Sequence, residues 1–360
     1  MTLFEHDESP SREAACQRLL SRFVPRVVPL RVESPGSGGG FSGAAIWRVV
    51  TEQGDFALRR WPNPGLPRPR ILGLHRLLEH LRREGLAYVA VPLATHDGTT
   101  LPHDVGHDWQ LEPWMPGLAD FHGDPSGDRL RAAMTALAQW HLAAVRFVPA
   151  DDSAQWFSSR GPSVSPAVAE RLTILDEAAE VTLRRVESRI ASAAKTSIRD
   201  QSRRIMELYR RARATVIGEL ELLREERVPL QPCLRDVWHD HLLFVGDRVA
   251  GLIDPSACRT ESVACDLSRL IGSLVGDDSV AWDIAIEEYH RHRPLRTGER
   301  ALITVFNRAG VLLSGWTWLE WLYLERRPFP DVVAVERRLH DILRRMEHLA
   351  EGEGQKLILP

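Results

Sequence analysis

Two carboxylates in one short stretch of the sequence have a spacing that suits phosphoryl transfer. Asp236 follows a short apolar segment, His241 stands five positions later, and Asp254 follows after thirteen more. Asp254 ends the apolar run 249–253, and Gly246 with its neighbour Asp247 supplies hairpin-turn chemistry before that run. The pattern predicts a loop, a strand, a turn and a second strand. That arrangement would bring both carboxylates close together at one site.

Phosphoryl transfer needs such a pair of carboxylates. One carboxylate orients the attacking hydroxyl and accepts its proton, and the other holds the metal that bridges the nucleotide phosphates. A second metal ligand is needed a few residues after the base, because two ions neutralise the developing charge better than one.

The elements that must position these residues divide the chain into a strand-rich first third and a helical remainder. The first third has strand-like runs and two amphipathic helical runs, the latter at 11–24 and 71–83. The predicted strands are 27–33, 44–50, 56–60, 89–93 and 109–112. A Pro/Gly joint at 113–117 ends this part of the chain.

Helical patterns dominate the rest of the chain. They cover 128–147, most of 164–228 and most of 260–350. The apolar stretch 306–324 carries charged residues, which indicates a buried helix and not a membrane span. The sequence therefore predicts an α+β fold with a nucleotide-binding lobe at 1–115 and a helical catalytic and substrate lobe at 116–360.

Composition limits the possible partners and the location of the protein. The chain has 360 residues and a formal net charge of −3, which gives no reason to expect nucleic acid or an anionic membrane. The four cysteines form no Cys-x-x-Cys pair, and their spacing with His239 and His241 fits no structural zinc pattern. The N-terminal residues lack an apolar core like that of a secretory signal, so a cytoplasmic location is expected.

The window around these carboxylates resembles the aminoglycoside phosphotransferase and choline kinase family of protein-kinase-like enzymes. Members read His-Gly-Asp-Leu-His-x-x-Asn-Val-Leu, then a hairpin, then Ile-Asp-Phe. Residues 234–243 read Leu-Arg-Asp-Val-Trp-His-Asp-His-Leu-Leu, and 252–255 read Leu-Ile-Asp-Pro. The segments 266–268 (Asp-Leu-Ser) and 137–141 (Leu-Ala-Gln-Trp-His) are similar to two further family stretches. The resemblance covers about 25–325 and implies a bilobal fold.

The resemblance assigns roles in the larger lobe. It implies that Asp236 is the catalytic base, that Asp254 is the principal metal ligand and that Asp266 holds the catalytic loop by hydrogen bonds. His241 takes the position of the second metal ligand. Magnesium prefers oxygen ligands, and an imidazole suits manganese better, so the metal is Mg²⁺ or Mn²⁺. Asp240 is the alternative oxygen ligand.

The resemblance also places ATP in the first lobe. The Gly-rich segment 39–44 stands where the family covers the phosphates, and Arg59 stands where a strand-borne basic residue reaches them. The segment 109–116 stands at the hinge that holds adenine. The residues implied in nucleotide binding are Gly40, Ser42, Gly43, Arg59, Glu112 and Trp114.

The sequence departs from the family pattern at several positions. Leu234 replaces the loop-opening His, and Arg59 replaces the usual Lys. The helix glutamate that pairs with that Lys is not evident. Glu79 and Glu84 are candidates, although the expected position is nearer 73–75. These departures keep a second hypothesis open, a nucleotide-binding protein without turnover, and nucleotidyl transfer on the same scaffold is a third.

The acceptor is left open by the sequence. The aromatic run around Trp316, Trp318 and Trp321 is either core packing or a wall for a cationic substrate. The arginines of 164–228 are either a solvated face or part of a site for an anion. Amino alcohols, homoserine-like amino acids, sugars and aminoglycosides all remain possible, and no oligomeric state is predicted. The predicted activity is ATP-dependent transfer of a phosphoryl group to a hydroxyl of a small metabolite.

Overall fold

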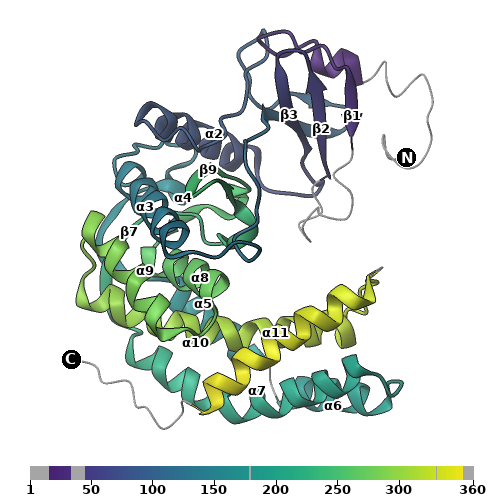
Figure 1. Cartoon of the computed structure of the whole chain (residues 1–360), viewed down its shortest axis with the longest axis vertical. Coiled ribbons are helices and arrows are strands. Elements are labelled where there is room, and N and C mark those ends of the chain that lie inside the picture. Colours follow the sequence, from purple (N-terminus) through teal and green to yellow (C-terminus); the bar gives the residue numbers. More distant parts are fainter. Residues whose placement is uncertain (1–15, 34–44, 178–179, 330, 352–360) are drawn as a thin grey trace.

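The first lobe is built on one antiparallel sheet. The computed structural model describes residues 16–33, 45–177, 180–329 and 331–351 (Figure 1). The sheet has the strand order β1-β2-β3-β5-β4. Its strands are β1 (Arg31–Glu33), β2 (Ala45–Thr51), β3 (Gly54–Arg60), β4 (His103–Asp104) and β5 (His107–Pro113).

Alternation along these strands separates an apolar face from a polar one. Leu58 on β3 lies opposite Trp47 on β2 and Leu111 on β5, and all three side chains are buried in the core of the sheet lobe. The next residue, Arg59, lies opposite Gln110 on the other face, because successive side chains of a strand point to opposite sides. The sheet therefore presents a cation and its polar neighbours on the face away from its apolar core.

The helix α2 (Arg68–Arg83), which the leucine spacing predicts, lies between β3 and β4 in the chain and packs into the larger helical core. The predicted strand at 89–93 joins no sheet. It makes one isolated bridge, from Val89 to Leu252, and the N–H of Leu93 donates to the carbonyl of Leu111 over 2.7 Å. This segment is apolar because it runs through the protein interior between α2 and β4.

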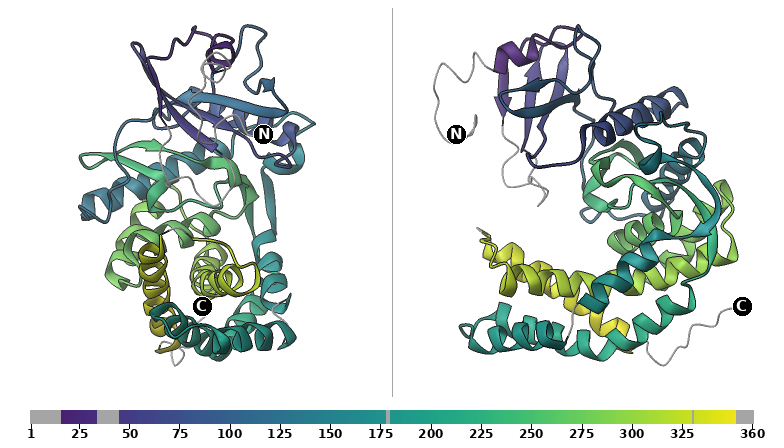
Figure 2. Two further views of the ribbon diagram at one scale, coloured as in Figure 1. Left: turned by 90° about the vertical axis from the view of Figure 1, so that its right-hand side faces the viewer. Right: turned by 180° about the vertical axis from the view of Figure 1, so that it is seen from behind.

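The larger part of the chain is mainly helical and lies at the other end of the molecule (Figure 2). Its helices are α3 (Gly127–Ala144), α4 (Ala154–Phe157), α5 (Pro166–Glu177), α6 (Glu180–Ser192), α7 (Ser197–Leu222), α8 (Val263–Val275), α9 (Ser279–His292), α10 (Thr297–Leu319) and α11 (Val332–Glu351). A π-helix, η4 (Glu320–Leu324), extends α10. No helix in the described part of the chain is both long and apolar enough to cross a bilayer.

A small sheet inside this helical part was not predicted. The strand β7 (Arg227–Cys233) pairs with β6 (Arg160–Val164) on one side and β10 (Arg259–Glu261) on the other. Its two prolines, Pro229 and Pro232, hide it from a sequence reading, because proline is rare in central strands.

The aromatic run near 316–323 forms core packing. Trp316 is fully buried and stacks on Tyr209 of α7, with ring centroids 5.2 Å apart. Trp318 and Tyr323 are also buried, and Trp321 packs edge-on against Trp318. The core interpretation of these residues is therefore correct.

Candidate active site

The catalytic loop and a hairpin bring the two predicted carboxylates to one region. The hairpin consists of β8 (Leu242–Val245) and β9 (Arg248–Leu252), and Asp254 follows it directly. The N–H of Ile253 donates to the carbonyl of His241 over 3.0 Å, which ties the loop to the end of β9. Burial lowers the pKa of His241, while the negative charges of Asp254 and Asp236 oppose that shift. Both carboxylates therefore border the same imidazole.

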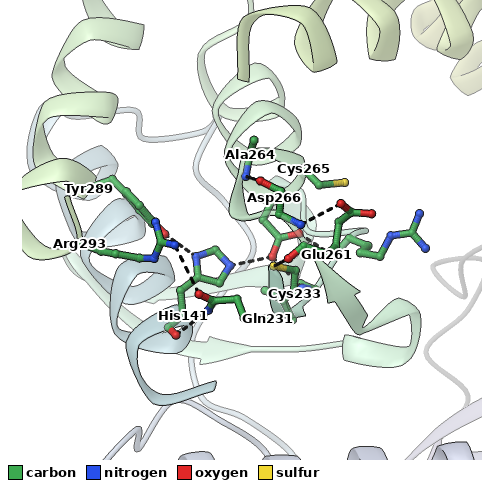
Figure 3. Close-up of polar contacts among 12 residues, drawn as sticks. His141, Gln231, Cys233, Glu261, Ala264, Cys265, Asp266, Tyr289 and Arg293 are labelled. Carbon is green, nitrogen blue, oxygen red and sulfur yellow. Dashed lines mark hydrogen bonds and ion pairs between the residues drawn. The ribbon is translucent and has the colours of Figure 1, made fainter. Parts of the chain in front are cut away.

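A fully buried carboxylate, Asp266, holds the loop before Asp236 by hydrogen bonds, and Figure 3 shows it beside His141 and Cys233. The two oxygens of Asp266 accept the backbone N–H groups of Leu234 and Arg235 over 2.7 and 2.6 Å. The Nε2 of His141 lies 3.0 Å from the same carboxylate, and its Nδ1 lies 2.7 Å from the hydroxyl of Tyr289. Burial lowers the pKa of His141. These contacts agree with a loop-holding role for Asp266 and a core role for His141.

Two non-glycine residues of the site have left-handed backbones. Arg235 has φ +64° and Asp254 has φ +52°. Such conformations cost about 1–3 kcal/mol each and persist only when their surroundings impose them. The Arg235 side chain pairs with Glu170 of α5, which also pairs with Arg259 on β10. A single carboxylate therefore links the loop before Asp236 to the segment after Asp254.

The strand-borne cation and the predicted metal ligand are in direct contact. Arg59 Nη2 lies 3.0 Å from Asp254 Oδ1, and the guanidinium lies over the ring of Trp61 at 5.3 Å. Burial acts to raise the pKa of Asp254, but the charges of Arg59 and His241 and the hydrogen bonds from Ser256 and Arg59 together lower it. The ionised Asp254 offers the hard oxygen atoms that Mg²⁺ or Mn²⁺ prefers.

In the described part of the chain, neither glutamate candidate forms an ion pair with Arg59. Glu79 of α2 is exposed, and Glu84 pairs with Arg146. The expected position holds His75, whose Nε2 lies 2.9 Å from the side-chain carbonyl of Gln110. Burial lowers the pKa of His75 to about 4, so this imidazole is neutral at physiological pH.

A carboxyl group from the neighbouring strand lies close enough to Arg59 to feel its charge. Gln110 Nε2 donates to Glu112 Oε2 over 2.6 Å, and Glu112 lies on the same face of β5. Burial raises the pKa of Glu112, and the charge of Arg59 acts against that shift. The sequence did contain a signal for this arrangement: the i, i+2 spacing of Gln110 and Glu112, read together with the cross-strand position of Arg59.

His241 makes hydrogen bonds that compete with metal binding. Its Nε2 accepts the indole N–H of Trp238 over 2.8 Å, and its ring also hydrogen-bonds to the backbone of Asp236. The imidazole would have to leave the indole N–H in order to bind a metal through Nε2. The alternative ligand Asp240 is exposed and lies 3.4 Å from His239 Nε2. The metal roles of His241 and Asp240 both stay predictions.

The other predicted nucleotide contacts are placed only in part. The backbone N–H of Trp114 donates to the carbonyl of Asp55 over 2.9 Å, and its ring lies 5.2 Å from the guanidinium of Arg48. Trp114 therefore has protein partners for both its N–H and its ring. The predicted phosphate-covering residues Gly40, Ser42 and Gly43 lie outside the described residues.

One buried group in the described chain has the atom spacing of a metal site, and its chemistry argues against one. His141, Cys233 and Asp266 place ligand atoms within 4.8 Å of one another. The Cys233 thiol donates to the carbonyl of Glu261 over 3.3 Å, and burial raises its pKa. Since the His141 and Asp266 atoms are also hydrogen-bonded to each other, this group is a structural network.

A cavity of about 420 Å³ lies between helices of the larger lobe. Trp282, Arg308 and Arg345 are among its lining residues, whereas Asp236 and Asp254 do not line it. The cavity is thus separate from the catalytic loop.

The comparisons with known proteins decide the family. A model described as the phosphotransferase enzyme family matches residues 36–302, which is most of the chain. The chain belongs to this family. The resemblance seen in the sequence is therefore confirmed. No curated protein matches the sequence of this family member.

Solved structures confirm the fold. An aminoglycoside phosphotransferase from Alicyclobacillus acidocaldarius matches with a TM-score of 0.66 at 14% identity, covering 98% of this chain and 97% of that one. A spectinomycin phosphotransferase in complex with ADP and spectinomycin matches with a TM-score of 0.67 at 12% identity, covering 93% and 97%. An amicoumacin kinase in complex with AMP-PNP and Ca²⁺ matches with a TM-score of 0.62 at 14% identity, covering 96% and 94%. The α+β, protein-kinase-like architecture of this phosphotransferase family member is correct as predicted.

Proposed function

We propose that the protein transfers the γ-phosphoryl group of ATP to a hydroxyl of a small molecule. The observation that carries this proposal is the contact of Arg59 with Asp254 beside the loop of Asp236. Asp236 orients the acceptor hydroxyl and accepts its proton. Arg59 presents a fixed positive fork to the phosphates.

Asp254 would hold Mg²⁺ or Mn²⁺, and a bound ion would neutralise phosphate charge. Glu112 remains beside Arg59 when Asp254 turns to the metal, so the guanidinium keeps an acidic neighbour. The similar structures that contain ADP or AMP-PNP support nucleotide binding by this protein. We further infer that the nucleotide-binding lobe ends near residue 115, within the hinge segment 109–116.

The departures from the family pattern are compatible with turnover. Leu234 is buried and its backbone N–H is held by Asp266, so the loop is fixed without the usual His. Without the helix glutamate, Arg59 still has Asp254 as an ion-pair partner and the carboxyl group of Glu112 nearby. These contacts support a catalyst over a nucleotide-binding protein without turnover.

The test is nucleotide consumption by the purified protein with Mg²⁺ and, separately, Mn²⁺, against a pool of small hydroxyl compounds. We expect ADP as the product, since nucleotidyl transfer would release pyrophosphate instead. Asp236→Asn should abolish turnover, whereas Asp247→Asn, a matched change in the exposed hairpin turn, should retain it. Failure to bind ATP with either metal would overturn the proposal.

A further inference from the structure

Two arginines from different helices flank the catalytic loop on one side. Arg269 of α8 pairs with the carboxylate of Asp236. Arg338 of α11 lies over the ring of Trp238, with its Cζ 5.9 Å from the ring centroid. Figure 2 shows α11, in yellow, reaching out from the helical lobe on the side toward which the sheet lobe also projects. The two guanidinium groups therefore meet at the loop that carries the base.

These two cations have little counter-charge of their own. Within the described residues, Arg338 has no carboxylate within 4.0 Å, and the partner of Arg269 is the catalytic carboxylate itself. Arg338 is accessible to solvent but partly desolvated, and this desolvation and the charge of Arg269 lower its pKa. Like charges that approach each other are unfavourable unless an anion joins them.

The acidic residues near Arg338 do not cancel this excess of positive charge. Asp341 on α11 and Asp240 on the loop act on Arg338 from a distance, and Asp240 lies 3.4 Å from His239. A third cation, Arg345, also repels Arg338, although it is committed to Asp277 at 3.2 Å. An anion bound beside Arg338 would therefore relieve the repulsion between these cations.

We propose, on the basis of the proposed function, that the phosphoryl acceptor carries an anionic group that Arg269 and Arg338 bind. A guanidinium offers parallel N–H donors that match a carboxylate or a phosphate, and these two anions are the chemistry we infer. The hydroxyl of such an acceptor reaches Asp236 while its anion takes Arg269 from that carboxylate. The ring of Trp238 lies beneath the guanidinium of Arg338 and fixes where that cation stands beside the loop.

The experiment compares acceptors that share a hydroxyl and differ in charge. Glycolate, glycolamide and ethanolamine form one set, and glycerol phosphate and glycerol form another. ADP release is measured with each, together with binding of ATP. We expect ADP release to be stimulated by glycolate, by glycerol phosphate or by both, which also distinguishes a carboxylate site from a phosphate site.

Variants of α11 then locate the site. Arg338→Gln should raise the KM for the anionic acceptor about 10- to 100-fold and leave the KM for ATP unchanged, because charge-assisted hydrogen bonds are lost. The KM of Arg338→Lys for the anionic acceptor should lie between those of the unaltered protein and Arg338→Gln, since lysine keeps the charge and loses the paired N–H donors of arginine. Arg337→Gln is the matched control on the same exposed helix, and it should behave as the unaltered protein.

Three results would overturn the inference. One is preferential use of glycolamide, ethanolamine or glycerol over the matched anion. Another is an Arg338→Gln effect on the KM for ATP alone. The third is intact ATP binding with no stimulation by either anion, which would leave the nucleotide part of the proposed function standing. A protein that fails to bind ATP at all would instead count against the proposed function.

Discussion

Replacing Asp266 by Asn should loosen the catalytic loop and lower the stability of the larger lobe. The change keeps the shape of the side chain and removes its charge. Leu234 and Arg235 donate to different oxygens of Asp266, so whichever way the amide is turned, one backbone N–H must face an NH₂ group. The position is completely buried, so water cannot replace the lost acceptor.

The magnitude follows from these contacts. One unpaired buried N–H costs about 1–3 kcal/mol, and the remaining hydrogen bonds lose about 1 kcal/mol each when their acceptor becomes neutral. We therefore expect Asp266→Asn to lower the free energy of unfolding by about 3–5 kcal/mol. Because Arg235 directly precedes Asp236, kcat should fall as well.

Urea unfolding followed by tryptophan fluorescence measures the first effect, and ADP formation measures the second. Asp278→Asn is the matched control, because Asp278 caps α9 from the surface and Asn caps equally well. A loss below about 1 kcal/mol for Asp266→Asn would refute the hydrogen-bond argument. An unchanged kcat would refute the claim that Asp266 positions the loop.

Three further predictions concern the hinge and the sheet lobe. Gly117 has φ +99°, and a Cβ there would lie 2.6 Å from the carbonyl oxygen of Phe244. Gly117→Ala should therefore lower Tm by several degrees. Gly218→Ala is the control and should not lower Tm, because a Cβ at this position on α7 would meet open space. The folded protein holds His75 neutral with a pKa of about 4. The free energy of unfolding should therefore fall as pH drops from about 6.5 to 4, by up to about 3 kcal/mol in total. Unfolding curves of His75→Gln should show a flatter pH dependence. Arg59→Gln removes the cation from Asp254 and should lower kcat/KM for ATP by about 100-fold, and an unchanged ATP affinity would show that Arg59 does not reach the phosphates.

Much of the site was predictable because it is local in sequence. The order Asp236, a hairpin and then Asp254 is carried by strand and turn signals within one stretch, and the hairpin forms where the sequence predicts it. The leucine spacing of α2 and the buried character of α10 also follow from local periodicity. The prediction of a strand at 89–93 was wrong, because a buried connecting segment has the same apolar sequence pattern as a strand.

The partners of these residues were decided by tertiary structure. Glu112 becomes a neighbour of Arg59 through strand pairing, so the i, i+2 spacing of Gln110 and Glu112 acquires meaning only once the register of β3 and β5 is known. Arg269 and Arg338 reach the catalytic loop from helices that follow Asp236 by 33 and 102 positions, and such contacts depend on how α8 and α11 pack. The sequence thus determined the family and the fold class of this protein, and it placed Asp236 and Asp254 on one short segment. The charges beside that segment were set only when distant helices packed together, because electrostatic interactions depend on distance in space and not on position along the chain.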